Sequence, residues 1–377
     1  MNWRAVAPWK VHVLDGRAAL DTLAGEWERL QEEAAASTPE LNPSAPFYSP
    51  RWFAIWADTS SGTPILAIAR RAGRLEAVLP LLAVDHSLAG VRCRMLQSLS
   101  DEHSPRFDLL CRSDEALEAI LTHLLERPNW DVLLLRDLLP GSNGERMTQL
   151  AEARGLPTGA WPSLTSPFLS LPGEEAQLDN TLSAKFRANL RRRAKKLTTD
   201  VGPLSLERID TEETLEAALD DGFRLEAAGW KGGRQTAIAC IPRLERRYRA
   251  LAHHAAKEGT LALYFLRAGS RRVAFHFGIA SERVYYLLKP GFDPTLASYG
   301  LGHLLVDRVA RDLIARGFRE LDFLGDTMDW KADWTAQART HRWRYIFRPT
   351  ATGHLLQKWK FNWAPALKSK FKKFHRG

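Results

Sequence analysis

The sequence has few cysteines, no long apolar run and fewer acidic than basic side chains. Its three cysteines, Cys93, Cys111 and Cys240, are odd in number and widely spaced, which argues against a disulfide framework or a zinc site and fits a reducing cytosol. We expect each to fill a core, since unpaired cysteine behaves as a small apolar side chain. The best apolar segment, DVLLLRDLLP, is interrupted by Arg136 and Asp137 and is far shorter than the ~20 residues of a membrane span. The N-terminus also lacks the apolar run of a signal peptide. We therefore expect a soluble protein, at most attached to a surface.

The charge balance is basic and the chain is long. The 377 residues carry a formal net charge of +9 with a pI of about 9.6, and 45% of them are hydrophobic. This length and apolar content predict roughly two domains. The excess of positive charge favours anionic partners such as nucleotides, phospholipid surfaces, nucleic acid or acidic polymers.

Hydrophobic periodicity predicts a mixed α/β sheet in the second half of the chain. A strand and two helices are followed by three consecutive strands, and then by a helix, a strand, an irregular segment and a last strand. A meander followed by a crossover helix and another strand is typical of a mixed α/β fold. The expected strands are 204–209, 260–269, 272–281, 283–291, 318–325 and 341–349, and the expected helices are 211–229, 241–259 and 302–317.

The first half shows similar elements in a blurred version of the same order. A helix at 23–36 and one beginning at Pro50 precede two strands joined at Ala72-Gly73, a helix at 115–127 and a strand at 130–138. No close sequence repeat is visible, so any duplication is degenerate. The composition shifts to Pro, Gly and Ser between residues 151 and 173. We therefore predict an N-terminal domain (1–172), a basic linker helix (173–200), a C-terminal domain (201–350) and a basic aromatic tail (351–377).

Short motifs follow one another along the chain in an order that resembles a known family. They are Pro46-Phe47 with Ser49-Pro50-x-Trp52, Leu79-Pro80-Leu81, Leu99–Asp101, LSAKFRANLRRRAKKL, Glu226 with Trp230-Lys231-Gly232, YYLLKPGFDP, YGLGHLL and DFLGDTMDWK. Together they resemble the CelD/BcsL-type family of acetyltransferases with the GNAT (Gcn-related N-acyltransferase) fold, which is related to the Fem aminoacyltransferases. The resemblance covers most of the chain. It implies an α/β fold with two tandem GNAT-like domains, the N-terminal one degenerate, and an acyltransferase whose co-substrate is acetyl-CoA or a longer acyl-CoA.

The loop before the helix at 302–317 has the features of an anion cradle. Gly300 and Gly302 allow close backbone approach, and the first amides of a helix lack internal partners and carry partial positive charge. The first turn contains no acid that would repel a phosphate. From the spacing alone a plain glycine-rich helix entry is the better interpretation. The resemblance implies that the pyrophosphate of coenzyme A lies here, at Tyr299, Gly300, Leu301, Gly302, His303 and Leu304.

The strand at 283–291 leads into this loop. Pro290-Gly291 would end its ladder pairing. The resemblance implies that the strand splays from its neighbour and that backbone groups near Leu287, Leu288 and Lys289 hold the thioester and stabilise an oxyanion. Tyr285 and Tyr286 point to opposite faces, so one would line the cleft and we take Tyr286 as the candidate. The alternative is an ordinary strand.

Four further side chains are candidates for acid–base work or substrate binding. Asp326 lies just past a strand end, where a carboxylate could take a proton from an attacking amine or hydroxyl, and Lys331 could bind an anionic group. His276 shares a strand face with small residues that would leave space above it. Glu226 ends an amphipathic helix and is raised to a candidate by the resemblance. Each has a structural alternative. Asp326 could cap a helix in a polar loop, His276 could be a hydrogen-bonded core residue, and Glu226 could be a solvated surface residue.

The sequence contains no nucleophile elbow, no Cys–His signature and no metal-ligand cluster. Direct transfer in a ternary complex is therefore the simplest mechanism, and it depends on positioning two substrates. The acceptor would be a small molecule or a saccharide, such as a polysaccharide precursor or another surface-associated metabolite, and the protein would be cytoplasmic.

Two basic segments leave other functions open. The helix LSAKFRANLRRRAKKL and the C-terminal LLQKWKFNWAPALKSKFKKFHRG are rich in Lys and Arg, and the second interleaves Trp and Phe. The tail could solubilise the protein, lie on the inner face of an anionic membrane or contact polysaccharide machinery, or bind RNA. One alternative function is therefore a Fem-like transfer from aminoacyl-tRNA. Another is a catalytically silent scaffold in polysaccharide biosynthesis.

Overall fold

The computed structural model describes residues 8–37, 45–88, 90–229 and 235–364. Its internal contacts divide the chain into two units, which are described separately. Unit 1 comprises Met1–Leu164 with Thr340–Gly377, and unit 2 comprises Thr165–Arg339. The units are therefore not two consecutive halves, because the last part of the chain returns to unit 1.

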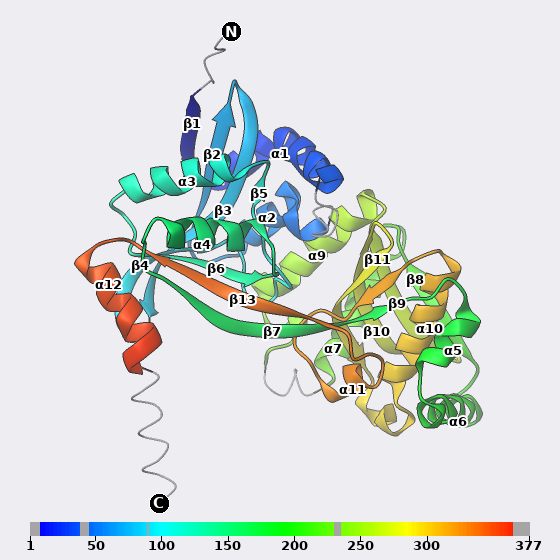
Figure 1. Ribbon diagram of the computed structural model, residues 1–377. Helices are drawn as coiled ribbons and strands as arrows, with labels where there is room; N and C mark the ends of the chain where they lie inside the picture. Colours follow the sequence, from blue (N-terminus) through cyan, green and yellow to red (C-terminus); the bar gives the residue numbers. More distant parts are fainter. Residues whose placement is uncertain (1–7, 38–44, 89, 230–234, 365–377) are drawn as a thin grey trace, which may run out of the picture. The chain divides into compact units, whose positions relative to one another are not determined.

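Unit 1 contains a mixed sheet with the strand order β1-β2-β3-β4-β6-β13 (Figure 1). Its pairs are antiparallel except β4 with β6. The strands are β1 (Trp9–Asp15), β2 (Thr63–Arg71), β3 (Arg74–Leu88), β4 (Val91–Ser98), β6 (Val132–Leu138) and β13 (Ala338–Phe347), and the short β5 (Leu110–Cys111) pairs with β3. The helices are α1 (Arg17–Ser37), α2 (Pro50–Ala57), α3 (Asp114–Glu126), α4 (Asn143–Ala153) and α12 (Ala351–Lys358).

Unit 2 contains a mixed sheet with the order β7-β12-β11-β10-β9-β8 (Figure 1). Only β11 and β12 run parallel among its assigned pairs. The strands are β7 (Thr158–Ser170, whose residues up to Leu164 belong to unit 1), β8 (Leu204–Ile209), β9 (Leu261–Ala268), β10 (Arg271–Ser281), β11 (Val284–Phe292) and β12 (Glu320–Asp322). The helices are α5 (Glu175–Thr181), α6 (Ala184–Asp200), α7 (Leu215–Ala227), α9 (Pro242–Lys257), α10 (Leu301–Ala315) and α11 (Asp329–Ala332).

The two units repeat one topology with their last strands exchanged. Each has a strand, two helices, a three-strand meander, a crossover helix and a strand parallel to the third meander strand. The next strand of the first repeat, β7, pairs with β12 of unit 2, whereas that of the second repeat, β13, pairs with β6 of unit 1. The structure thus confirms the predicted mixed α/β class with a degenerate duplication.

The sheet of unit 2 is covered on both faces. Alternation along β10 sends Phe275 and Phe277 toward α7 and α9, where Phe275 meets Gly222 and Phe277 packs on Tyr248 with ring centroids 5.2 Å apart. The other face forms a buried cluster with α10 that includes Tyr264, Leu305 and Val309. These packed layers hold β11 and α10 in fixed positions next to each other.

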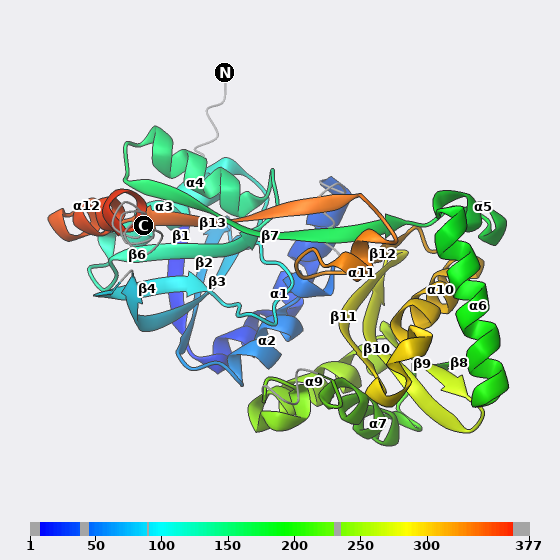
Figure 2. The ribbon, with the colours of Figure 1, turned by 90° about the horizontal axis from the view of Figure 1, so that it is seen from below.

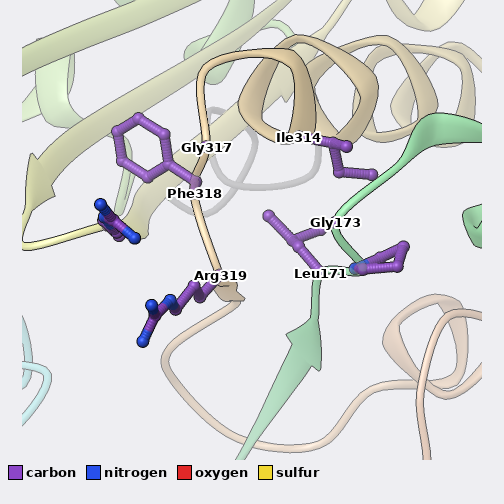
Figure 3. Close-up of a pocket in the computed structure, with 8 residues that line it drawn as sticks. Leu171, Gly173, Ile314, Gly317, Phe318 and Arg319 are labelled. Carbon is purple, nitrogen blue, oxygen red and sulfur yellow. The ribbon is translucent and has the colours of Figure 1, made fainter.

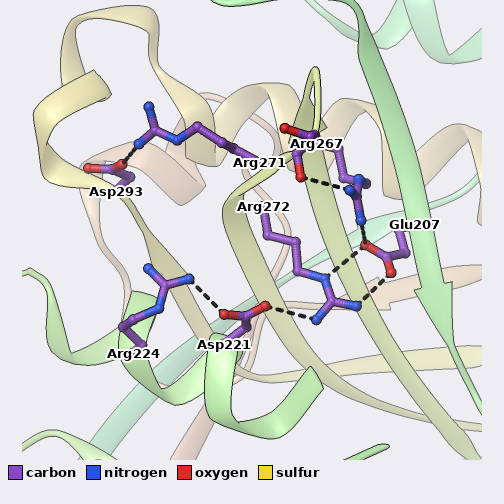
Figure 4. A network of polar contacts seen from close by, with 8 residues as sticks. Glu207, Asp221, Arg224, Arg267, Arg271, Arg272 and Asp293 are labelled. Atoms are coloured by element: carbon purple, nitrogen blue, oxygen red, sulfur yellow. Dashed lines mark hydrogen bonds and ion pairs between the residues drawn. The ribbon is translucent and has the colours of Figure 1, made fainter. Parts of the chain in front are cut away.

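Ion pairs connect α7 with strands β10 and β8 of this sheet (Figure 4). Arg272 on β10 lies 2.6 Å from Glu207 on β8 and 3.0 Å from Asp221 on α7. Arg267 shares Glu207, and Arg271 pairs with Asp293. The Arg272 guanidinium lowers the pKa of the Glu207 carboxyl, so the pair stays ionised at neutral pH.

Most predicted strands and helices are confirmed, and two expectations were not met. Cys93 and Cys111 are buried as expected, but Cys240 is exposed at the end of a short 3₁₀ turn, so its prediction as a core residue was wrong. The segment around residues 158–170 forms strand β7, which the sequence did not predict because Pro162 and Pro167 remove backbone donors.

Candidate functional site

Strand β11 separates from its parallel neighbour part of the way along. It pairs with β12 only over Val284–Tyr286, although β11 continues to Phe292. On its other side the register with β10 shifts, since Leu287 lies opposite Gly278 and Lys289 opposite Phe277. Leu288 is therefore the extra residue of a β-bulge. The predicted thioester segment, Leu287 to Lys289, lies at this separation.

The predicted cradle is the N-terminus of α10. A 3₁₀ turn at Pro294–Tyr299 precedes Gly300, which is left-handed with a φ of 64° and leaves the helix without a side-chain cap. The first turn has no acidic residue. In the described protein, the amides of Leu301, Gly302 and His303 donate to no backbone or side-chain acceptor. These orphan amides and the helix dipole attract an anion.

Helix α6 brings positive charge to the same place (Figure 2). A Cβ added to Gly300 would lie 2.6 Å from Nη1 of Arg193. Lys196 Nζ is 5.3 Å from the ring centre of Tyr299, whose hydroxyl donates to Asp200 at 2.8 Å. The seven basic residues of α6 (Lys185, Arg187, Arg191, Arg192, Arg193, Lys195 and Lys196) form no ion pair within the described part of the chain. Arg193 was not a predicted site residue, and its signal in the sequence is the basic run.

A groove of about 250 Å³ continues from the cradle between α5, α6 and α10. Arg311 in this groove is paired with Asp179 and Asp307. The Arg187 Nε is buried and has no hydrogen-bond partner among the described residues. The groove is lined by Asp179, Arg187, Leu190, Arg191, Ala194, Leu304, Asp307, Arg308 and Arg311.

His303 connects the cradle to the segment after β12. Its Nδ1 lies 3.2 Å from Trp334 Nε1, and its ring packs edge-on against Phe186 of α6 with centroids 5.2 Å apart. Burial lowers the pKa of His303. An imidazole that is neutral at pH 7 can accept a hydrogen bond from Trp334 Nε1. This bond links the start of α10 to the segment after β12.

The predicted Asp326 lies on the loop after β12, and the predicted Lys331 lies in the short helix α11 that follows this loop. Leu324 and Gly325 both have positive φ, 49° and 54°, so the chain turns sharply here. Lys331 is buried and donates to the carbonyls of Leu324 (2.5 Å) and Asp326 (2.7 Å), and burial lowers its pKa to about 8. Asp326 is exposed and accepts from the amides of Thr165 (3.1 Å) and Thr327 (2.9 Å). Lys331 thus shapes the loop that presents Asp326.

Glu226 lies where α7 meets the free part of β11. It is 3% exposed, and a Cβ on Gly291 would lie 2.6 Å from its backbone nitrogen. Its carboxylate accepts from the amide of Ile238 at 2.9 Å. The Trp230-Lys231-Gly232 motif that accompanies it in the sequence lies outside the described residues.

His276 and Tyr286 are both fully within the sheet. His276 lies opposite Tyr264 and Pro290 on the α10 face, is 1% exposed, and its Nδ1 has no hydrogen-bond partner in the described protein. Burial lowers its pKa to about 3, so it is neutral at physiological pH. Tyr286 is 0% exposed and lies beside Asp322 at the last β11–β12 pair. The structure therefore places both next to the separation of the strands rather than in open solvent.

A cavity of about 480 Å³ lies at the other end of α10 (Figure 3). Ile314, Gly317, Phe318 and Arg319 line it together with Leu171. The C-terminus of α10 brings partial negative charge to this cavity, and Arg283 and Arg319 bring positive charge to it. Among the described residues, no group of three or more His, Cys, Asp or Glu side chains is arranged to hold a metal. No helix of the described part is both long and apolar enough to cross a membrane.

Comparison with known proteins agrees with the topology of unit 2. Residues 184–332 match the family model described as acetyltransferase (GNAT) domain. No curated protein matches the sequence. A solved structure titled FemX is 12% identical, with a TM-score of 0.53 over 80% of this chain and 92% of that one.

Two other solved structures share the fold at the same identity of 12%. A conserved protein of unknown function from Bacteroides thetaiotaomicron VPI-5482 has a TM-score of 0.53 over 90% of this chain and 99% of that one. L-PGS from Bacillus licheniformis has a TM-score of 0.50 over 82% and 96%. At this identity the likeness concerns the fold. Unit 2 therefore contains a GNAT-type acyltransferase domain, so this chain is a transferase, and unit 1 repeats the GNAT-like topology in degenerate form.

Proposed function

We propose that unit 2 transfers an acyl group from acyl-CoA to an amine or hydroxyl by direct attack in a ternary complex. The observation that carries this proposal is the path of β11. It leaves β12 after Tyr286, bulges at Leu288 and leads to the uncapped, acid-free N-terminus of α10. One continuous segment thus offers backbone groups for a thioester and amides for a phosphate.

The phosphates of the donor would bind at the start of α10. Three orphan amides and the positive end of the helix dipole face this point, and Arg193 lies beside Gly300. The cations of α6 add attraction, since they outnumber the carboxylates near them and no described carboxylate forms an ion pair with them. The buried Nε of Arg187 in the neighbouring groove also lacks an acceptor, which an anionic donor group could supply.

The thioester would lie along the free edge of β11 near Leu288. The nitrogen or oxygen of the acceptor attacks the thioester carbonyl carbon, and a backbone amide of this segment stabilises the resulting oxyanion. The carbon–sulfur bond then breaks, the acyl group stays on the acceptor and the thiolate takes up a proton. The proton lost by the acceptor passes to a base or to water.

Two carboxylates lie on elements next to β11, one on α7 and one on the loop after β12, the strand that pairs with the first part of β11. Glu226 is buried beside Gly291, and Asp326 is exposed on the loop shaped by Lys331. We propose Glu226 or Asp326 as the base and Lys331 as a positioning residue for Asp326. His276 is neutral at pH 7 and could accept a proton, but its burial keeps it from direct contact with a bulky acceptor. Tyr286 would support the bulge from the α7 side.

For the acceptor, the resemblance to the CelD/BcsL-type family favours a sugar, a polysaccharide precursor or another surface-associated metabolite. The same resemblance favours a cytoplasmic enzyme, with the basic tail as the segment that could reach a membrane or polysaccharide machinery. Both statements rest on the motifs in the sequence.

Calorimetric titration with acetyl-CoA tests the donor site. Gly302 has open space around its Cβ position, so Gly302→Glu adds a carboxylate without a clash. We expect Gly302→Glu to weaken acetyl-CoA binding by at least about tenfold, because the charge opposes phosphate at a helix N-terminus. Gly302→Gln is the matched neutral control and should change the affinity by less than about threefold. Equal losses in both variants, or no binding by the wild type, would contradict the proposal.

The cationic helix α6 favours one second candidate, an aminoacyl-tRNA donor. Titration of the same preparation with tRNA separates the two, because binding through many phosphate contacts falls steeply with salt. Binding of tRNA without acetyl-CoA would favour this candidate. A folded protein that binds neither would favour the scaffold.

A further inference from the structure

Unit 1 carries an exposed aromatic surface close to its C-terminal helix. Trp161 on β7 is 40% exposed, Leu355 on α12 52%, and Trp363 in the π-helical turn Trp359–Trp363 46%. Leu355, Trp359 and Trp363 are spaced four residues apart, which places them along one side of the helical segment. We call Leu355, Trp359 and Trp363 the outer aromatic face. The exposed Trp161 lies next to Phe361, with ring centroids 6.3 Å apart.

The opposite side of this helical segment packs against unit 1. Phe361 lies over the backbone of β7, since a Cβ on Gly159 would be 2.2 Å from its ring. Phe361 also packs edge-on against Tyr345 of β13, with centroids 5.4 Å apart, and Leu356 is 1% exposed. The segment is therefore fixed by its inner residues, and its outer face has a defined orientation.

The helical segment that carries the outer aromatic face has charged side chains of one sign only. The sequence contains no aspartate or glutamate from Trp334 to the C-terminus. Lys358 is exposed, and Lys360 Nζ lies 4.8 Å from the ring centre of Trp161. The structure describes the chain up to residue 364. After that point the sequence ends in KSKFKKFHRG, which again mixes lysine and phenylalanine.

We propose that the outer aromatic face docks on an anionic lipid bilayer. Tryptophan is the side chain that favours the headgroup level of a membrane, where its ring is half-buried and its N–H stays hydrated. Lysines at the rim of such a face bind anionic headgroups. An apolar face bordered by lysine, on a segment that is anchored from behind, has the composition of an interfacial membrane helix. This inference is independent of the proposed acyl transfer in unit 2.

A second copy of this chain fits the outer aromatic face less well than an anionic bilayer does. A second copy would bring two lysine-bordered faces together without any carboxylate from the region after Trp334 to neutralise them. An anionic bilayer supplies that negative charge, and it also covers the apolar rings. Charge complementarity therefore favours lipid.

Co-sedimentation of the full chain with vesicles tests the proposal. We expect the protein to sediment with vesicles of mixed phosphatidylglycerol and phosphatidylcholine. With vesicles of pure phosphatidylcholine it should stay in the supernatant. The variant Leu355→Ser/Trp363→Ser should bind the anionic vesicles at least about tenfold more weakly, since two apolar side chains no longer enter the interface. Lys358→Glu should weaken binding less and make it less sensitive to salt.

Two controls separate this surface from general effects. Val91→Ser changes another exposed apolar residue of unit 1, 37% exposed, and should leave vesicle binding unchanged. Light scattering without lipid reports the mass of the free protein. Equal binding to both kinds of vesicle, undiminished binding of the double variant, or a dimer that the double variant dissociates would each overturn the proposal.

Discussion

The two units repeat one topology but differ at the start of the crossover helix. In unit 1, α3 begins with Ser113, whose hydroxyl accepts from the amide of Ala116 at 3.4 Å, and two acids, Asp114 and Glu115, follow in the first turn. In unit 2, α10 begins with a left-handed Gly300, and its first turn has neither a side-chain cap nor an acid. The fold supplies a helix N-terminus in both units. The side chains at this N-terminus determine whether its amides are available to bind an external anion.

A second helix in unit 1 shows the same filling of a helix end by the chain itself. Asp108 accepts from the amides of Gly144 (2.8 Å) and Asn143 (2.9 Å) at the start of α4. Its carboxyl is buried, and this burial raises its pKa to about 7. The starts of α3 and α4 in unit 1 are thus filled by side chains of the chain itself, whereas the start of α10 in unit 2 has no such group.

The largest effect on stability is expected from Asp108→Ala in unit 1. The change leaves two buried amides of α4 without an acceptor, which should cost about 3 kcal/mol of the free energy of unfolding. Asp108→Asn keeps one acceptor oxygen and should cost less. Urea unfolding of both variants measures the difference. A loss below about 0.5 kcal/mol in Asp108→Ala would show that water replaces the carboxylate and that the end of α4 is not internally filled.

The next largest effect on stability is expected from replacing either of the glycines at the two ends of α10 with alanine. Gly300 and Gly317 both have positive φ, 64° and 77°, so alanine at either position should cost about 1 kcal/mol. A Cβ at Gly317 meets nothing within 4 Å, whereas one at Gly300 would displace Arg193. Because the displaced group is the end of a flexible side chain, the positive φ dominates the cost, and stability should fall by a similar amount in the two variants. Acetyl-CoA affinity, measured by calorimetry, should fall only in Gly300→Ala.

If Gly317→Ala lowered the affinity as much as Gly300→Ala, helix stability alone would explain the loss. Arg193 would then have no part in holding the donor, and the contrast between α10 and α3 would rest on the acids of the first turn.

Local signals in the sequence were sufficient for the meander and crossover helix of unit 2. The alternating residues of β10 and the four-residue spacing of Leu305, Val309 and Leu313 each report the face that packs in the core. Gly300 was found in the same way, because a glycine before a helix that lacks an acid in its first turn is a local pattern. These features depend on neighbours within one or two turns of the chain.

The features that were missed depend on distant parts of the chain. The exchange of β7 and β13 between the two sheets leaves no local pattern, since both strands pair far from their neighbours in the sequence. Arg193 reaches Gly300 only because α6 packs beside the 3₁₀ turn before α10. The bulge at Leu288 is likewise a matter of register with β10, although the segment that contains it was predicted.

The smallest effect is expected from Glu115→Gln, which removes an acid from the first turn of α3. A hydrogen bond from Ser113 lowers the pKa of this exposed carboxyl, so its contribution to stability exists above the unfolded pKa and is lost as the pH falls through the folded one. The variant should therefore have a slightly lower Tm at pH 7, and the difference should vanish on acidification. Calorimetry should find no additional acetyl-CoA site, because the Ser113 hydroxyl still caps the start of α3 by accepting from the amide of Ala116. A second site in this variant would mean that charge alone distinguishes the units. Its absence would mean that the cap of α3 and the open Gly300 of α10 matter as well.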